Sequence, residues 1–297
     1  MKRFSQAIEN RALSFACEGQ TLQAVLTTPK PGDGTPGPTL GVLIVVGGPQ
    51  YRAGSHRQFT LLARDLAQHG FPVLRFDQRG MGDSSGSLHD FKQITPDIGA
   101  ALTAFETALP GLHRTVIWGL CDGASAALLY WQQTRDRRVA GLCLLNPWVR
   151  SEASLAKATV KHYYLDRLKQ PDFWRKLFRG GIAREALLSL ISNLRRARSQ
   201  GPASTTDSLS FQHAMAAAWL NPPGPILLLL SGRDLTAQEF LETVASDPAW
   251  SRSLELPQLT RHDLPEADHT FSNRSQLEQA HARTIEWLHT FAQEVSR

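Results

Sequence analysis

The sequence predicts an α/β fold in which a mostly parallel central sheet is flanked by helices. Short apolar runs, such as 40–47 and 226–231, alternate with longer segments whose apolar residues recur at helical spacing. This alternation is typical of parallel strands joined by crossover helices. A chain of 297 residues with 42% hydrophobic and 20% charged residues also provides a sizeable core, which argues against disorder.

The elements follow one another in a regular series. An N-terminal hairpin is expected over 11–28, with its turn at Glu18-Gly19, and a Pro- and Gly-rich loop follows at 30–38. Strands are expected at 40–47, 72–77, 115–119, 139–145 and 226–231, with a last strand near 252–260. Helices are expected at 56–69, 97–109, 123–134 and 236–246, and an amphipathic closing helix at 275–295.

The series is interrupted between about 151 and 220, where helical patterns rich in Arg, Lys and aromatic residues occur without strands. We therefore expect residues 1–150 and 221–297 to form the core and residues 151–220 to form a helical lid. An insertion after the carboxyl end of a strand lies over the crevice where such sheets bind ligands. The alternative is that these helices only extend the scaffold.

The positive charge of the chain is local. Residues 151–200 carry 11 Lys and Arg against 4 Asp and Glu, whereas the whole chain has a net charge of +5. General nucleic-acid binding is therefore not expected. The basic segment suggests an anionic substrate or carrier, although such a charge run is more often a solvated face.

Cysteine usage and the chain's start predict a cytoplasmic protein. Cys17, Cys121 and Cys143 are the three cysteines, and their wide spacing matches neither a disulfide framework nor a metal-binding pair. No motif indicates NAD, haem or zinc, so no cofactor or metal is expected. No apolar segment follows the basic start, and the apolar runs are far below the roughly 20 residues that span a bilayer. We expect no signal peptide and no integral membrane segment.

One motif carries the chemistry. Gly119-Leu120-Cys121-Asp122-Gly123 fits G-x-S-x-G with cysteine in place of serine, between an apolar strand and a helix of small residues. This is the strand-turn-helix context of the nucleophile elbow of α/β-hydrolases. The amino end of the following helix favours a thiolate, so Cys121 is the candidate nucleophile. The alternative is a small buried cysteine, which is the interpretation we give to Cys143.

Two partners follow in the order nucleophile, acid, base that is typical of this fold. Asp234 follows the strand at 226–231, and His269 lies in a loop before the closing helix. His269 would accept the thiol proton, and Asp234 would fix its tautomer. The alternatives are His262 as the base and Asp263 or Asp268 as the acid.

The oxyanion hole of this fold uses the backbone N–H after the nucleophile, here that of Asp122, and one donor from the loop after an earlier strand. That loop is Gly47-Gly48-Pro49-Gln50-Tyr51-Arg52, in which Pro49 has no N–H to donate. Gln50 is the candidate, through its backbone or its side chain. The turn at 77–84 lacks the GK[ST] ending of a phosphate loop, and we interpret it as a tight turn beside the site.

The segments GGPQYRAGSHRQF, FDQRGMGDSSG, GLCDGAS, LLNPWV and EADHTFS resemble the α/β-hydrolases associated with bacterial exosortase A systems, of the first type. The resemblance runs over nearly the whole chain. It implies a cytosolic hydrolase or acyltransferase encoded beside genes for extracellular polysaccharide and protein sorting. By position, it implies a triad of Cys121, Asp234 and His269. The cysteine departs from the usual serine hydrolases and is similar to that of dienelactone hydrolases and polyhydroxyalkanoate synthases.

The sequence therefore favours an enzyme that attacks an ester or a thioester, free or carrier-bound, through an acyl-enzyme on Cys121. Hydrolysis and transfer to another nucleophile both remain open. The second hypothesis is a catalytically inactive binding or scaffold protein in polysaccharide export, because a fold alone does not certify activity. A dehalogenase or epoxide hydrolase is disfavoured, since it would need a carboxylate at the position of Cys121.

Overall fold

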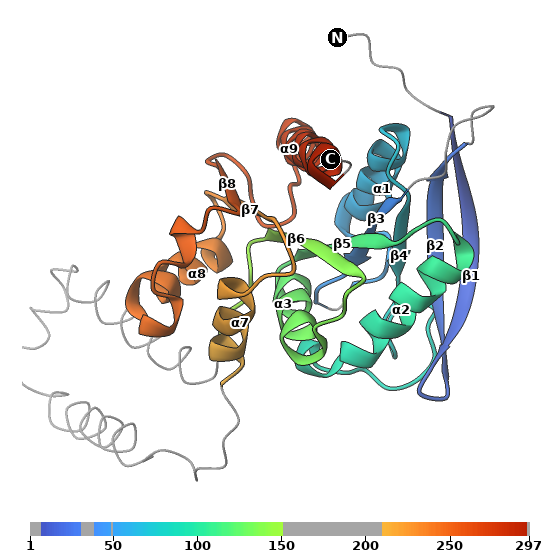
Figure 1. The fold of residues 1–297 in the computed structure, drawn as a ribbon, viewed down its shortest axis with the longest axis horizontal. Helices are drawn as coiled ribbons and strands as arrows, with labels where there is room; N and C mark the ends of the chain where they lie inside the picture. Colours follow the sequence, from blue (N-terminus) through green and yellow to red (C-terminus); the bar gives the residue numbers. More distant parts are fainter. Residues whose placement is uncertain (1–6, 31–38, 49, 151–209, 296–297) are drawn as a thin grey trace, which may run out of the picture. The chain divides into compact units, whose positions relative to one another are not determined.

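The computed structural model describes residues 7–30, 39–48, 50–150 and 210–295 (Figure 1). In this part of the chain, eight strands form one sheet in the order β1-β2-β4-β3-β5-β6-β7-β8. They are β1 (Ile8–Cys17), β2 (Gln20–Pro29), β3 (Leu40–Val45), β4 (Val73–Phe76), β5 (Arg114–Leu120), β6 (Val139–Leu145), β7 (Ile226–Ser231) and β8 (Leu259–Leu264). From β4 to β8 every neighbouring pair is parallel, whereas β1 and β2 join the sheet antiparallel. The predicted mostly parallel sheet is confirmed.

Helices cover both faces of this sheet, so its central strands read as unbroken apolar runs. The described α-helices are α1 (Gln58–Gln68), α2 (Thr95–Ala108), α3 (Asp122–Thr134), α7 (Phe211–Leu220), α8 (Leu235–Ser246) and α9 (Arg274–Val295). Short 3-10 turns are η1 (Ser55–Arg57), η2 (Phe91–Gln93), η3 (Pro248–Trp250) and η4 (Ser253–Glu255). Helices α1 and α9 bury their apolar sides in one core cluster, and α2, α3, α7 and α8 in the other.

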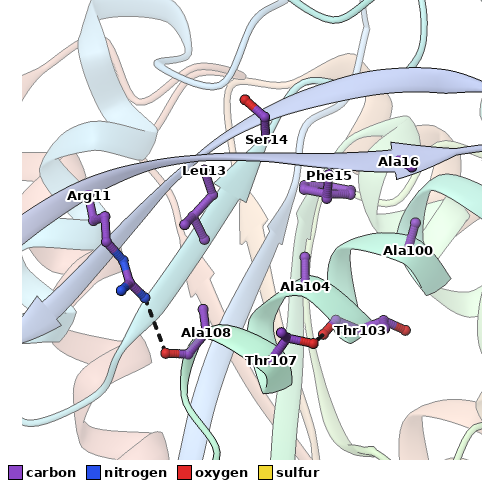
Figure 2. A pocket seen from close by; sticks show the side chains of 10 residues that line it. All are labelled: Arg11, Leu13, Ser14, Phe15, Ala16, Ala100, Thr103, Ala104, Thr107 and Ala108. Carbon is purple, nitrogen blue, oxygen red and sulfur yellow. Dashed lines mark hydrogen bonds between the residues drawn. The ribbon is translucent and has the colours of Figure 1, made fainter.

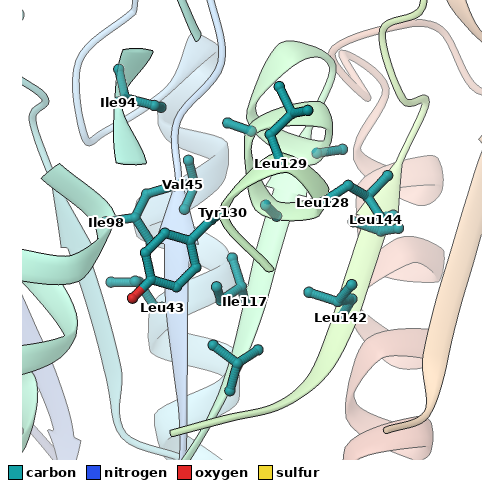
Figure 3. Packing of buried hydrophobic residues seen from close by; sticks show 14 of the residues in the cluster. Leu43, Val45, Ile94, Ile98, Ile117, Leu128, Leu129, Tyr130, Leu142 and Leu144 are labelled. Carbon is teal, nitrogen blue, oxygen red and sulfur yellow. The ribbon is translucent and has the colours of Figure 1, made fainter. Parts of the chain in front are cut away.

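The alternation of side chains along each strand divides the core into these two clusters. Leu43 and Val45 of β3 face α2 and α3, together with Ile117 of β5 and Leu142 of β6 (Figure 3). The intervening residues Val42 and Ile44 face α1 and α9. All of the residues of β3 are buried. The strand that leads into the loop after β3 is thus packed on both faces.

The predicted N-terminal hairpin is present, with β1 and β2 in register from Ile8↔Pro29 to Cys17↔Gln20. Its two turn residues have positive φ, 46° at Glu18 and 76° at Gly19. This conformation is typical of a two-residue hairpin turn. β1 forms one edge of the sheet.

The last strand is not where the sequence placed it. The strand expected near 252–260 is β8 at Leu259–Leu264, and the residues before it form the turns η3 and η4. Trp250 in η3 is 1% exposed and packs against Trp219 and Phe240. The apolar residues of this stretch therefore bury against α7 and α8 rather than along the sheet. β8 itself carries polar, partly exposed side chains because it is an edge strand.

Most of the predicted lid, residues 151–209, lies outside the described residues. The remainder includes α7, whose Met215, Ala216, Ala218 and Trp219 are buried in the core cluster that contains α3. This end of the segment is thus packed into the core unit, and a lid over 151–209 stays a prediction.

Within the described ranges, none of the helices combines the length and apolar character that crossing a bilayer would need.

The side chain of Asn146, which follows β6, is hydrogen-bonded to Ser231 at the end of β7 and provides a test of this packing. It is fully buried, its Oδ1 accepts a hydrogen bond from Ser231 N at 2.8 Å, and its Nδ2 donates to Ser231 Oγ at 2.9 Å. We expect Asn146→Ala to lower the free energy of unfolding by about 2–4 kcal/mol, because it leaves a buried N–H without an acceptor. Chemical denaturation measures this. The exposed Asn221→Ala should change stability by less than about 0.5 kcal/mol, and an equal effect of the two substitutions would contradict the assigned role of Asn146.

Candidate active site

Cys121 stands at a sharp, strained turn between β5 and α3. Its backbone has φ 60° and ψ −127°, which a non-glycine residue rarely adopts. Glycines on both sides make this turn possible. A Cβ on Gly119 would fall closer than 3.0 Å to backbone atoms of Gly123, and one on Gly123 would meet the Val45 carbonyl as closely. The glycines at positions 119 and 123 are therefore required by close backbone packing, as the motif predicts.

The three cysteines differ in accessibility. Cys121 is partly exposed, whereas Cys17 and Cys143 are buried. Burial raises the pKa of the Cys143 thiol, which keeps it neutral. Cys121 is thus the cysteine whose exposure suits a nucleophile, and Cys143 behaves as the core residue that its place in a strand predicts.

Asp234 and His269 are brought together from the ends of neighbouring strands. Asp234 follows β7 and caps α8, its Oδ1 accepting a hydrogen bond from Thr236 N at 3.0 Å. Its Oδ2 lies 2.7 Å from Nδ1 of His269. Asp234 is only 5% exposed, so its carboxylate is largely desolvated. With Nδ1–H donating to Asp234, the other ring nitrogen of His269, Nε2, is left to face the nucleophile.

The electrostatics of His269 link it to both predicted partners. A hydrogen bond with Asp234 and, second, one with Cys121 raise the pKa of His269 to about 10, against an opposing effect of burial. The imidazole is therefore stabilised in its protonated form between a carboxylate and the sulfur. The geometry brings Cys121, Asp234 and His269 into one constellation.

The alternatives weighed from the sequence are engaged elsewhere. His262 lies within β8, and burial lowers its pKa. Asp263 pairs with Arg261, with 2.9 Å between Oδ1 and Nε. Asp268 accepts hydrogen bonds from the backbone N–H groups of Thr270 and Ser272, which shapes the loop that carries His269.

The loop after β3 lies against the elbow. Gly48 donates its backbone N–H to Asp122 Oδ1 at 2.6 Å. Gln50 donates its own backbone N–H to Gly48 O at 2.8 Å, and its side-chain Oε1 accepts from Ser55 N at 3.1 Å. Because Ser55 N–H is a donor, it fixes which end of the Gln50 amide is oxygen. The backbone of Gln50 is therefore committed locally, and its Nε2 is the end of the amide that can donate to a ligand.

An ion pair that sequence reasoning missed holds the same loop from its other side. Arg52 N donates to Asp77 Oδ1, and the Arg52 guanidinium pairs with Asp77 and Asp83. Asp77 is 1% exposed, and it also accepts from Asp83 N at 3.0 Å. The turn at 77–84 is thus a structural anchor for the 50–57 loop. The charged residues of the DxRGxG pattern were the sequence feature that could have indicated this anchor.

A cavity of about 320 Å³ adjoins the elbow and is lined by Asp122 and Gly48 together with Val46, Gln78, Met81, Leu88, His89, Asp90 and Phe91. A larger cavity, about 620 Å³, lies between β1 and α2 (Figure 2). Its lining runs from Arg11 to Ala108 and includes none of Cys121, Asp234 and His269. The smaller cavity is not lined by these three residues either, but it adjoins the elbow through Asp122 and the loop after β3 through Gly48.

In the described part of the chain, His, Cys, Asp and Glu do not form a group of three or more that could hold a metal ion.

The sequence profile of the family described as serine aminopeptidase, S33, matches residues 39–219, which is more than half of the chain. The chain belongs to the serine aminopeptidase S33 family of hydrolases. This S33 hydrolase has the α/β-hydrolase fold, as the elbow motif and the order of its strands predict. It departs from the serine in the family's description by carrying Cys121 at the elbow.

Individual relatives are distant. The S33 hydrolase is 34% identical over 131 residues to the uncharacterized protein PA2218 of Pseudomonas aeruginosa, a match that covers 42% of this chain but only 33% of that protein. The esterase Pf2001 of Pyrococcus furiosus superposes with a TM-score of 0.61 at 16% identity, over 95% of this chain and 91% of the esterase. Est1E of Butyrivibrio proteoclasticus, whose structure holds ferulic acid, gives a TM-score of 0.58 at 17% identity, over 96% of this chain and 100% of Est1E. These structural likenesses support the fold.

The raised pKa of His269 predicts a titration that NMR can follow. The imidazole midpoint is expected near pH 10 rather than at its ordinary 6.5. Asp234→Asn should lower this midpoint substantially, because the bond to Asp234 is the largest cause of the shift. Asp263→Asn, which removes an aspartate that pairs with Arg261 on β8, is the matched control and should leave it nearly unchanged. A wild-type midpoint at 6.5 would contradict the coupling.

The raised pKa of His269 also makes the stability of the folded protein depend on pH. A pKa that is higher in the folded than in the unfolded state favours folding wherever the proton is bound. The contribution of His269 is complete below about pH 6.5 and is lost as the pH rises through about 10. Denaturation of wild type and Asp234→Asn should therefore show a stability difference that narrows across this window.

Proposed function

We propose that the chain is a cysteine-dependent hydrolase or acyltransferase that acts on an ester or thioester through an acyl-enzyme on Cys121. The observation that carries this proposal is the bond of 2.7 Å between His269 Nδ1 and Asp234, on an imidazole whose pKa the Cys121 side chain also raises. Nucleophile, base and orienting carboxylate in this arrangement support covalent acyl chemistry. The strained elbow places Cys121 directly before the first residue of α3.

The proposed reaction has two halves. The thiol proton of Cys121 passes to Nε2 of His269, and the sulfur attacks the substrate carbonyl carbon to form a tetrahedral oxyanion. Collapse of this intermediate breaks the bond to the leaving alcohol or thiol, which takes the proton back from His269. Water then gives a proton to His269 and attacks the thioester, and the acid leaves as the sulfur recovers the proton. An amine or hydroxyl in place of water makes the reaction a transfer.

Two groups are proposed to hold the oxyanion: the backbone N–H of Asp122 and the side chain of Gln50. The loop offers few other donors, since Gly48 N–H is bonded to Asp122 and Gln50 N–H to Gly48. Pro49 has no N–H. The Gln50 amide, with its oxygen held by Ser55, can present Nε2 as a fixed donor of the kind that stabilises such intermediates.

The substrate is proposed to be a small ester or thioester, free or bound to a carrier. The S33 family is a hydrolase family. Pf2001 is named as an esterase, and the structure of Est1E holds ferulic acid. The resemblance to exosortase-associated hydrolases suggests a cytoplasmic role beside polysaccharide export. The basic stretch at 151–200 would favour an anionic carrier, such as a phosphopantetheine thioester.

Acylation of Cys121 is the first test. Incubation with p-nitrophenyl esters or acyl-CoA should give a mass increase of one acyl group on the Cys121 peptide, blocked by iodoacetamide. Cys121→Ala should lower kcat/KM by at least about 10³-fold, the scale on which loss of a triad member acts. Cys17→Ala, which removes a different cysteine, should keep turnover. Full turnover by Cys121→Ala would eliminate the proposal and leave the non-catalytic scaffold as the better account.

The proposed role of Gln50 predicts a specific change in the steady-state kinetic constants. Gln50→Ala should lower kcat by about 10²–10³-fold with little change in KM, because the donor acts on the oxyanion rather than on bound substrate. Gln50→Glu tests the same donor, since a carboxylate cannot donate and would repel the oxyanion. Steady-state kinetics on one ester measures both variants. A loss confined to KM would assign Gln50 to substrate binding instead.

A further inference from the structure

Asp122, the residue after the candidate nucleophile, makes a contact that its backbone role does not explain. Its side-chain Oδ1 accepts the N–H of Gly48 at 2.6 Å, across 74 residues of sequence. The same oxygen fills the space where a side chain at position 47 would lie, because a Cβ on Gly47 would fall closer than 3.0 Å to it. The carboxyl is thus wedged between the elbow and the glycines of the loop after β3.

We propose that the Asp122 carboxyl is a positioning residue that ties the loop 47–50 to the elbow and thereby holds the Gln50 side chain at the oxyanion. This inference rests on the function proposed above. The N–H of Asp122 and the carboxyl of Asp122 then serve the same site in different ways: the first touches the oxyanion, and the second places the other donor.

The environment strengthens this tie. The carboxyl is partly buried, and burial raises its pKa against the opposing effects of backbone hydrogen bonds, of which the one from Gly48 is the largest and those from Gly123 and Asp122 itself follow. A hydrogen bond is stronger where water is excluded, so the contact restrains the loop more than an exposed one would. Gly48 has φ 63°, and there is no room for a side chain on Gly47. Neither residue has a side chain that could hold the backbone by packing, so the bond to Asp122 restrains it here.

The loop has anchors beyond this point as well. Ser55 holds the Gln50 amide oxygen, and Asp77 holds the backbone and guanidinium of Arg52. These contacts fix the outer part of the loop to itself and to the turn at 77–84. The bond from Gly48 to Asp122 connects the loop to the elbow, and so sets the distance between Gln50 and the sulfur. Misplacement of a catalytic group by about 1 Å can cost about 100-fold in rate.

Two substitutions separate the tie from the charge. Asp122→Asn removes the charge but keeps an oxygen that can accept from Gly48, whereas Asp122→Ala removes the acceptor. We expect single-turnover acylation of Cys121 by a p-nitrophenyl ester to fall at least tenfold in Asp122→Ala and less than threefold in Asp122→Asn, with KM nearly unchanged in both. Equal losses in the two variants would overturn the proposal, and so would a rise in rate in Asp122→Ala.

Alkylation by iodoacetamide provides the matched control reaction. It proceeds by displacement at carbon and forms no oxyanion, so it reports on the thiol and His269 but not on the oxyanion loop. The alkylation rates of Asp122→Ala and Asp122→Asn should agree within about twofold. A tenfold slower alkylation of Asp122→Ala would assign the defect to the nucleophile and overturn the proposal.

A double-mutant cycle tests whether Asp122 acts through Gln50. If it does, Asp122→Ala should cost much less in a Gln50→Ala background than in the wild type, because coupled residues are not additive. The same tenfold loss in both backgrounds would overturn the proposal.

Hydrogen exchange of the Gly48 amide tests the tie without any substrate. Exchange should be slow in wild type and Asp122→Asn and at least tenfold faster in Asp122→Ala. Equal exchange in the three proteins would overturn the tie itself. If Cys121 shows no acylation while the exchange pattern holds, the function proposed above fails and the structural tie stands.

Discussion

The close approach of backbone at the elbow is the constraint on which the site depends. Gly119 and Gly123 pack against each other, and Gly123 packs against the Val45 carbonyl, so β5, α3 and the end of β3 meet without side chains between them. Cys121, with its strained φ of 60°, packs against the core cluster that contains α1 and α9. The same packing fixes the start of the loop after β3. The candidate nucleophile and the loop proposed to hold the oxyanion are therefore positioned by one feature of the fold.

The framework was predictable from the sequence wherever one physical signal dominated. β3, β5 and β7 are buried on both faces, so each is an unbroken apolar run that cannot be read as a surface segment. The hairpin turn at Glu18-Gly19 and the elbow glycines carry their own local signatures. β8 was misplaced because an edge strand half exposed to water, Leu259–Leu264, is less apolar than the Trp250 segment that precedes it. Tertiary packing of that tryptophan, rather than strand propensity, decides the local structure.

The placement of Cys121, Asp234 and His269 after strand ends could be predicted from the sequence, whereas the contacts around them could not. The order of Cys121, Asp234 and His269 along the chain follows from where each strand ends, and strand ends were visible. The bond of Asp122 to Gly48 and the pairing of Arg52 with Asp77 join polar groups far apart in sequence. Such contacts produce no periodic pattern in the sequence. A single aspartate at position 122 is equally compatible with a side chain that points into solvent. The choice between the backbone and side chain of Gln50 also needed the position of Ser55.

The surroundings of His269 suit a thiol better than a hydroxyl in the proposed reaction. Its pKa is raised by two neighbours, and Asp234 remains throughout, whereas the contribution of Cys121 ends when the sulfur is acylated. Once the thiol proton has passed to His269, the imidazolium is stabilised beside the sulfur and can deliver this proton to the leaving group. After acylation the imidazolium loses one stabilising partner, which eases release of its proton and leaves a neutral imidazole to activate water. A serine hydroxyl is a far weaker acid than a thiol, so the same histidine would have to extract a far less acidic proton during the attack.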